Sequence, residues 1–241
     1  MHPNSTPVSV RTAPLVQADV RSDVAAGLVI PTDLDSWHPG DVVRWAAEQF
    51  GADALAVTAS FKDAVLVHVA ATAVPGIEIV LLDTQYHFAE TLWFAEQLRQ
   101  RLDLNLRVVG PERGIVPDNL WQTDTDACCN LRKVQPLARA LEGRAAWVTG
   151  LRRADAATRT HAPVAAFDVK RSLVKVNPLA TLTEADVELY EQLYDLPRNP
   201  LTDRGYPSIG CWPCTRPVAL GEDRRAGRWA GTGKTECGLH T

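Results

Sequence analysis

The chain has 241 residues, 46% of them apolar, a formal net charge of −4 and a pI near 5.9. It is long enough for one large domain with its own core, and its acidic balance gives no overall case for binding nucleic acid or an anionic membrane. No apolar run approaches the roughly 20 residues of a membrane span. Residues 1–37 lack the charged and apolar regions of a secretory signal, which predicts a mobile lead-in and a cytoplasmic protein.

Apolar strand-like runs alternate with helical segments from about residue 38 to residue 196. This alternation is typical of a parallel sheet covered by helices on both faces. It predicts a doubly wound α/β domain over 38–196, in which ligands bind beyond the carboxyl ends of the strands. The expected strands are 52–60, 77–84, 105–110, 145–150 and 172–180, and the expected helices are 38–51, 63–73, 88–102, 128–143 and 183–196.

The predicted strands end in polar stretches that suit phosphate: TASFKDAV, LLDTQYHF and TGLRRADAATR. Their convergence at one edge of the sheet predicts a nucleotide site. After Leu196 the sequence is rich in Pro, Gly and Arg and has no hydrophobic periodicity. We expect residues 197–241 to form an irregular C-terminal segment, held by metal ligands at its base and mobile beyond them.

Five cysteines in a chain without an export signal indicate a reducing compartment, where clustered cysteines are more often ligands or catalytic groups than disulfides. Cys128 and Cys129 are adjacent, and Cys211 and Cys214 form a CxxC knuckle. Zinc usually draws on two knuckles, which an adjacent pair does not provide. An iron–sulfur cubane takes one thiolate at each iron corner, so the pattern favours a cluster over zinc, with a set of buried thiols as the third interpretation.

The fifth cysteine, Cys237, lies in the terminal stretch TECGLHT between Lys234 and His240. Cationic surroundings favour the reactive thiolate, and the glycines of AGRWAGTGK suggest a segment that swings like a lid. The alternative is an incidental exposed thiol. Arg132 and Lys133, which follow the cysteine pair, are either surface charges or donors to the cluster and substrate.

A group of arginines follows the strand-like run AAWVTG. Arginine offers forked donors that suit phosphate and sulfate oxygens. The stretch is therefore either a solvated charge run or an anion site, and its place after a strand favours the anion site. Its arginines are Arg152, Arg153 and Arg159.

The sequence resembles the assimilatory adenosine 5′-phosphosulfate (APS) reductases of the PAPS/APS reductase family. The resemblance rests on three motifs together: CC-x-x-R-K, a CxxC some eighty residues later, and a terminal ECGLH. LDTQYHFAET is similar to that family's LDTG-x-x-x-x-ET element, and TGLRR to its arginine loop. The similarity covers roughly residues 38–240. It implies an adenine-nucleotide alpha-hydrolase-like α/β fold with a modified pyrophosphatase loop.

The resemblance also implies roles for single residues. Cys237 would be the nucleophile, Lys133 a link between cluster and substrate sulfate, and His240 part of the ECGLH element. A [4Fe–4S] cluster would be held by Cys128, Cys129, Cys211 and Cys214. Phosphosulfate contacts would come from Lys133, Arg159, Arg225 and Arg228, and further substrate contacts from Ser60, Leu82, Thr84, Gly150 and Arg152.

The activity implied by the resemblance is thioredoxin-dependent reduction of APS to sulfite and AMP through an S-sulfocysteine, in sulfate assimilation toward cysteine. Three alternatives stay open. PAPS reductases look similar but typically lack the four cluster cysteines. An iron–sulfur RNA-thiolation enzyme would need an SGGxDS loop and a basic RNA face. The last alternative is a nucleotide-binding or redox-sensing module without catalysis. The partners expected are thioredoxin or a similar dithiol protein and the small substrate; the sequence leaves the oligomeric state open.

The chain departs from the family pattern in its loops. The phosphate loop usually reads SG-x-x-D, whereas here Ser60 occupies the glycine position and Phe61 adds bulk. Gln85 replaces the glycine of LDTG, and Ala156 and Ala157 replace more polar residues. These changes concern the nucleotide contacts and leave the sulfur chemistry intact.

Overall fold

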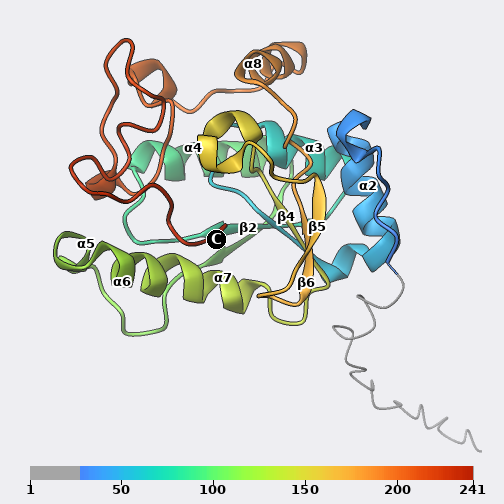
Figure 1. Cartoon of the computed structure of the whole chain (residues 1–241), viewed down its shortest axis with the longest axis horizontal. Coiled ribbons are helices and arrows are strands. Elements are labelled where there is room, and N and C mark those ends of the chain that lie inside the picture. The colour runs from blue at the N-terminus through green and yellow to red at the C-terminus, as the bar shows by residue number, and fades with distance from the viewer. Residues whose placement is uncertain (1–27, 241) are drawn as a thin grey trace, which may run out of the picture.

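The computed structural model describes residues 28–240, which form a single six-stranded sheet in the order β3-β2-β1-β4-β6-β5 (Figure 1). All neighbouring strands pair in parallel except β5, which pairs antiparallel with β6 at one edge. The predicted doubly wound, mostly parallel sheet is therefore confirmed. The strands are β1 (Leu55–Thr58), β2 (Glu78–Leu82), β3 (Asn105–Val109), β4 (Ala146–Thr149), β5 (Ala165–Asp168) and β6 (Leu173–Val176).

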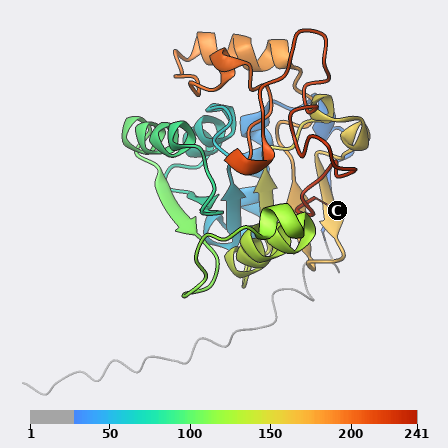
Figure 2. The same cartoon turned by 90° about the vertical axis from the view of Figure 1, so that its left-hand side faces the viewer.

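Helices cover both faces of the sheet. Successive side chains of a strand point to opposite faces, so one strand contributes to the apolar cluster on each side. Val57 and Val148 belong to the larger apolar cluster, which also contains Val42 of α2 and Phe94 of α4. Trp147 faces the smaller cluster, together with side chains of α7. Figures 1 and 2 show this sandwich of helices around the sheet. The main helices are α2 (Pro39–Phe50), α3 (Val65–Ala73), α4 (Ala89–Arg101), α5 (Leu120–Thr123), α6 (Thr125–Cys129), α7 (Gln135–Ala140) and α8 (Glu184–Leu193).

Two features of the fold differ from the sequence prediction. Strand β5 was not predicted, because it lies at the sheet edge and its mixed burial pattern gives no continuous apolar run. The helix predicted over 128–143 is interrupted by a π-helical turn, Asn130–Val134, between α6 and α7. Such turns widen the helix by one residue and are frequent at functional sites.

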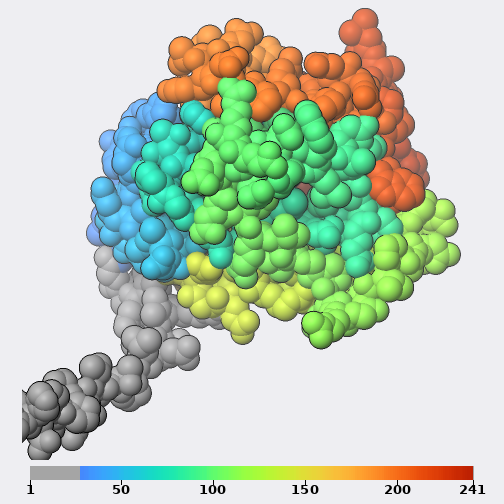
Figure 3. Space-filling view, turned by 180° about the vertical axis from the view of Figure 1, so that it is seen from behind, coloured from blue at the N-terminus to red at the C-terminus, as the bar shows by residue number. Residues whose placement is uncertain are grey.

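The two ends of the described chain pack against the sheet domain. Leu34 is buried in the larger cluster and Asp35 pairs with Arg153, so residues 28–37 of the predicted lead-in lie on the core. Residues 1–27 and 241 lie outside the described part. The segment 197–240 has only short 3₁₀ turns, Thr202–Arg204 and Trp212–Cys214, and Figure 3 shows the orange stretch that contains α8 and the start of this segment over one side of the molecule. None of the helices within residues 28–240 has the length and apolar character required to cross a membrane.

Candidate active site

A pocket opens at the carboxyl ends of β1 and β4, where the strand order reverses. The chain runs from β1 outward to β2 and β3, and returns to the other side of β1 as β4. In doubly wound folds this crevice binds ligands. The cavity measures about 230 Å³. It is lined by every residue predicted to act on or bind the substrate: Ser60, Leu82, Thr84, Lys133, Gly150, Arg152, Arg159, Arg225, Arg228, Cys237 and His240.

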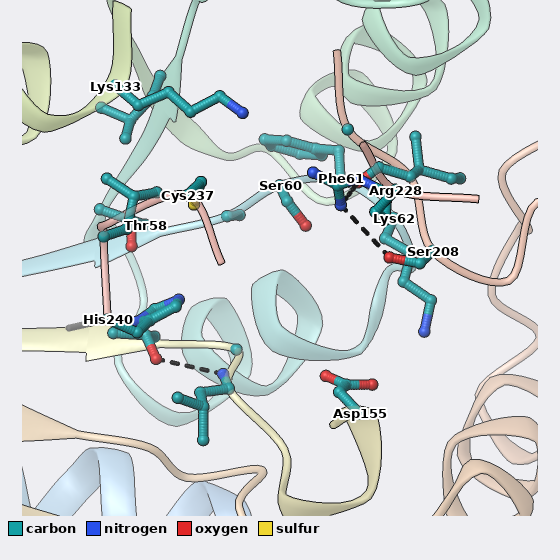
Figure 4. Close-up of a pocket in the computed structure, with 18 of the residues that line it drawn as sticks. Thr58, Ser60, Phe61, Lys62, Lys133, Asp155, Ser208, Arg228, Cys237 and His240 are labelled. Carbon is teal, nitrogen blue, oxygen red and sulfur yellow. Dashed lines mark hydrogen bonds between the residues drawn. The ribbon is translucent and has the colours of Figure 1, made fainter. Parts of the chain in front are cut away.

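Figure 4 shows Lys133, Cys237 and His240 on one side of this pocket and Lys62, Ser208 and Asp155 on the other. The side chains come from the π-helical turn, the loops after β1 and β4, and the C-terminal segment. Segments far apart in sequence therefore meet at one cavity. The sequence placed these residues in one site, and the structure brings them together.

The loop after β1 carries the left-handed backbone that the missing glycine would favour. Phe61 has φ 53°, a conformation that costs a non-glycine residue energy, so the left-handed position falls one residue after Ser60. The Phe61 ring is buried, and its carbonyl accepts a hydrogen bond from Asn199 Nδ2 at 3.0 Å. Asp63 Oδ1 accepts from the Val65 backbone at 3.2 Å, at the start of α3. Packing and these bonds hold a strained loop at the pocket.

The loop after β2 shows the same feature at Gln85, whose φ is 63°. Its backbone N–H donates to Asp83 Oδ1 at 2.8 Å, and its side-chain amide donates to the Ile115 carbonyl at 2.7 Å. Its amide oxygen accepts from Arg132. The substitution of glycine therefore gives this loop new hydrogen bonds, which join it to the helix that carries the cysteine pair.

Arg132 is fully buried and holds the chain around the cysteines. It donates to the Val116 carbonyl at 2.8 Å, pairs with Asp118 at 3.1 Å and lies 4.8 Å from the centre of the Tyr86 ring. It does not line the pocket. Of the two basic residues after the cysteine pair, one is thus structural and only Lys133 reaches the cavity.

The two pairs of cysteines approach each other beside the pocket. Cys211 forms an isolated antiparallel bridge with His87, and its thiol lies 3.4 Å from Thr84 Oγ1. Cys128 and Cys211 are buried in one small apolar cluster, with Cys214 packed against it. All five cysteines are free thiols. The loop after β2 therefore brings the CxxC knuckle to the helix that ends in Cys128 and Cys129.

The donor set suits a cluster better than one metal ion. Burial first, and then the neighbouring thiols of Cys129, Cys211 and Cys214, raise the pKa of Cys128 to about 11. Within residues 28–240, no three metal-binding side chains converge closely enough to hold a single ion. An iron–sulfur cubane needs thiolates that face one another across a wider space, one at each iron. The chain supplies four free cysteines from two segments, and three of them raise the pKa of the fourth, so the number and type of donors match such a cluster.

Lys133 lies between the cysteines and the terminal thiol. It is buried, on the π-helical turn, and its Nζ is 6.0 Å from the centre of the Trp229 ring. Burial lowers the pKa of Lys133, but the thiols of Cys211 and Cys237 outweigh this, and the net pKa is raised. The ammonium is thus charged at neutral pH and lies within electrostatic reach of both cysteines.

Arg228 also lines the pocket and lies beside Lys62 and Ser208 (Figure 4). Its guanidinium lies 4.5 Å from the centre of the Trp229 ring, and Nη1 donates to Ser208 Oγ and the Ile209 carbonyl, both at 3.3 Å. Its Nε is buried without a partner in the described residues. A Cβ at position 210 would clash with the guanidinium, so a side chain there would require Arg228 to move. Burial also lowers the pKa of Arg228 from its ordinary value.

The other predicted anion-binding arginines are paired with carboxylates of the chain itself. Arg159 and Arg225 contact Glu236, and Arg152 contacts Asp155 at 2.9 Å and Glu184 at 3.0 Å. Only Lys133 and Arg228, of the four cations expected to bind phosphosulfate, have no carboxylate partner among the residues the structure describes.

The last residues of the chain are docked in the pocket. Gly238 has φ 82°, which glycine adopts without strain, and it turns the chain directly after Cys237. The Leu239 carbonyl accepts from Arg171 at 2.8 Å. The His240 ring stacks on Trp147, with centroids 5.4 Å apart and an interplanar angle of 7°. Burial, and then nearby cations, hold the pKa of His240 well below its ordinary value, so the ring is neutral.

Four residues that form the site were not predicted: Trp147, Arg171, Trp229 and Glu236. The first lies in a buried strand and the second in a short turn, so neither carries a local signal. Trp229 lies within the glycine-rich stretch AGRWAGTGK and Glu236 within the terminal stretch TECGLHT, and this position was the available signal.

Comparison with known proteins gives consistent results. Residues 54–217 match the model of the phosphoadenosine phosphosulfate reductase domain. Adenosine 5′-phosphosulfate reductase of Streptomyces coelicolor is 46% identical over 206 residues, covering 83% of this chain and 87% of that protein. The protein of the same name from Mycobacterium tuberculosis is 41% identical over 255 residues, covering 97% and 99%.

Solved structures show the same relation. Phosphoadenylyl-sulfate (PAPS) reductase from Candida auris, in a phosphate complex, has a TM-score of 0.67 and 26% identity, covering 79% of this chain and all of that one. FMN adenylyltransferase from Candida glabrata shares the fold alone, with a TM-score of 0.55 and 13% identity over 83% of this chain and 72% of that one. The chain therefore belongs to the phosphoadenosine phosphosulfate reductase family of oxidoreductases, and within it is similar to proteins named adenosine 5′-phosphosulfate reductase.

Proposed function

We propose that the chain reduces adenosine 5′-phosphosulfate to sulfite and AMP through an S-sulfocysteine on Cys237, with thioredoxin or a similar dithiol protein as the electron donor. One observation carries the proposal. Cys237 lines the same pocket as Lys133 and Arg228, interacts electrostatically with both, and neither cation has a carboxylate partner in residues 28–240. A nucleophile beside two uncompensated cations suits a substrate with an anionic, electrophilic centre.

In the first step, the Cys237 thiolate attacks the sulfur of the substrate. The bond between sulfur and the bridging oxygen breaks, and AMP leaves with that electron pair. Lys133 and Arg228 stabilise the negative charge that develops on the sulfonate and phosphate oxygens. The enzyme then carries a sulfonate on Cys237, and sulfur has not yet been released as sulfite.

In the second step, a thiolate of the dithiol donor attacks Cys237 Sγ. The sulfur–sulfur bond breaks and sulfite leaves with the electron pair, which reduces the transferred sulfur by two electrons. The donor's second thiol resolves the mixed disulfide and restores the Cys237 thiolate. Both electrons come from the dithiol, so the balance needs no other reductant.

We also propose that Cys128, Cys129, Cys211 and Cys214 hold a [4Fe–4S] cluster. Cys128 and Cys211 are buried in one small apolar cluster with Cys214 packed against it, and Cys129 is buried four residues before Lys133. When bound, the cluster would supply fixed negative charge on its ligands and a cross-link between the helix and the CxxC knuckle. Cys211 and Cys237 both raise the pKa of Lys133, and the negative charge of the cluster would further keep its ammonium group charged beside the substrate.

The test is intact-protein mass spectrometry on anaerobically purified enzyme mixed with APS and no reductant. We expect the mass of one SO₃ group to be gained, to map to Cys237, and to be lost as sulfite when thioredoxin is added. Cys237→Ser is the control and should remain unlabelled. Labelling by PAPS but not by APS would make the chain a PAPS reductase, and labelling by neither would end the reductase proposal.

A further inference from the structure

Glu236, the residue before Cys237, has the densest set of ionic contacts in the docked tail. Arg159 donates to its carboxylate twice, from Nε at 2.9 Å and from Nη2 at 2.7 Å. Thr158 Oγ1 adds a longer contact at 3.3 Å. Arg225 Nη2 approaches the same carboxylate at 3.4 Å and donates to the Thr235 carbonyl at 2.9 Å. We call Arg159, Glu236 and Arg225 the tail clamp.

The tail clamp joins three parts of the molecule at the pocket. Arg159 comes from the loop after β4, Arg225 from the C-terminal segment, and Glu236 from the tail. The side chains of Arg159, Arg225 and Glu236 are only 12%, 14% and 13% exposed. Charge-assisted, bidentate bonds of this kind fix direction as well as distance. Since Glu236 and Cys237 are neighbours, the clamp also fixes where the thiol points.

The other tail contacts do not fix the thiol in this way. Lys234 pairs with Asp126, whose side chain is 85% exposed. Leu239 and His240 are held on the far side of Gly238, where the backbone turns. Removing the clamp would therefore leave the terminus attached through His240, while the Cys237 thiol would no longer be held in one orientation.

We propose that Glu236 is a positioning residue: the tail clamp holds Cys237 toward the substrate sulfur, and it opens when the tail presents the S-sulfocysteine to the dithiol donor. The inference rests on the proposed function. The sulfonate left on Cys237 places a second negative charge beside Glu236. Arg159 and Arg225 then face two anions instead of one, which weakens their hold on the carboxylate and favours release of the tail.

The test uses Glu236→Gln, which keeps the size of the side chain and removes its charge. Glu222→Gln is the matched control, since Glu222 accepts two bonds from Arg216, both at 2.9 Å, in the same segment but away from the pocket lining. The first measurement is the single-turnover rate of SO₃ transfer to Cys237, followed by mass spectrometry. We expect Glu236→Gln to slow it by about tenfold to a hundredfold, and the control to match the wild type.

The second measurement needs no substrate. Iodoacetamide, a neutral reagent, should alkylate Cys237 several times faster in Glu236→Gln than in the wild type or in Glu222→Gln, and Glu236→Asp should recover part of the protection. Release of sulfite from preformed adduct by thioredoxin should not be slowed. Unchanged AMP binding in each variant would show that the pocket is folded.

A different role for Glu236 would give different results. If the carboxylate merely occupied the substrate's anion site, APS would bind more tightly to Glu236→Gln in a Cys237→Ser background, and SO₃ transfer would not slow. Either that result or wild-type alkylation of Glu236→Gln overturns the inference. If the wild type itself forms no adduct, the proposed function fails, while the alkylation rates still report on the clamp.

Discussion

The sheet domain and the C-terminal segment are held together by different forces. The sheet domain buries apolar strands between two layers of helices, with side chains such as Phe94 and Val148 fully enclosed. The segment 197–240 is organised around Trp229, a buried ring with cations on several sides. These lie at 4.5–6.0 Å from its centre: Lys133, Arg225, Arg228 and Lys234. Burial of apolar surface stabilises the sheet domain whether or not a ligand is bound.

The second region depends on anions, because gathered cations repel one another. Burial and the charge of Arg225 both lower the pKa of Arg228. The Glu236 carboxylate pairs with Arg225, and the thiol groups of Cys211 and Cys237 raise the pKa of Lys133. On the proposed function, we expect the segment nearest the chemistry to depend more on bound anions than the sheet domain does.

The largest expected effect follows from removing one of the four cysteines. Cys211→Ser should abolish the visible iron–sulfur absorbance and turnover, because a cluster loses an iron ligand and the knuckle loses its cross-link. Limited proteolysis should then cut within 197–240 and leave the sheet domain intact. The control is Cys237→Ser, which should lose turnover but keep the absorbance and the protection. Equal protection of Cys211→Ser would contradict the proposed cross-link.

The next effect compares one buried ring from each region. Phe94→Ala should lower the free energy of unfolding by about 3–5 kcal/mol, because it leaves a cavity in the larger apolar cluster. Trp229→Ala should change global unfolding less and instead speed proteolysis of 197–240, since the ring contacts that segment and its cations. Chemical denaturation of both variants measures the loss of global stability, and limited proteolysis of both measures the local opening of 197–240. A similar drop in unfolding free energy for both would remove the distinction.

The sequence predicted the fold well where one physical signal dominated. Short apolar runs between helical segments, such as 77–84 and 145–150, are typical of buried parallel strands, and a strand forms within each of them. The pocket followed from the same logic, because polar residues after parallel strands must meet at one edge. The cysteine pattern and the terminal ECGLH identified the family, which the comparisons confirm.

The remaining features depend on contacts that no local pattern carries. The partner of Arg159 is Glu236, 77 residues away, so a sequence that shows only an arginine cannot tell a substrate contact from an ion pair within the chain. The π-helical turn arises within a sequence that reads as continuous helix. The left-handed backbone at Phe61 and Gln85 depends on long-range hydrogen bonds that compensate for the strain.

The smallest expected effect concerns the carboxyl group of Glu191 in the sheet domain. Its negative charge lowers the stability of the fold, whereas the negative charge of Glu236 in the tail clamp holds the tail in place. Glu191 of α8 is 6% exposed, and burial, together with the carboxylate of Asp63, raises its pKa to about 7 despite Arg198 at 3.4 Å. In the folded chain this carboxyl keeps its proton up to about pH 7, but in the unfolded chain it loses the proton near its ordinary value of 4.5. The free energy of unfolding therefore falls as the pH rises through that window.

Glu191→Gln removes this cost, because an amide cannot ionise. We expect it to raise the free energy of unfolding by roughly 2 kcal/mol at about pH 8, and to leave it unchanged at about pH 4, where the carboxyl is protonated in both states. Urea denaturation at the two pH values measures this, with the exposed Glu188→Gln on the same helix as the control. A loss of stability at pH 8 would mean that the ion pair with Arg198 outweighs burial. Buried ion pairs would then stabilise the sheet domain as they stabilise the C-terminal segment. The two regions would differ only in how much apolar surface each buries.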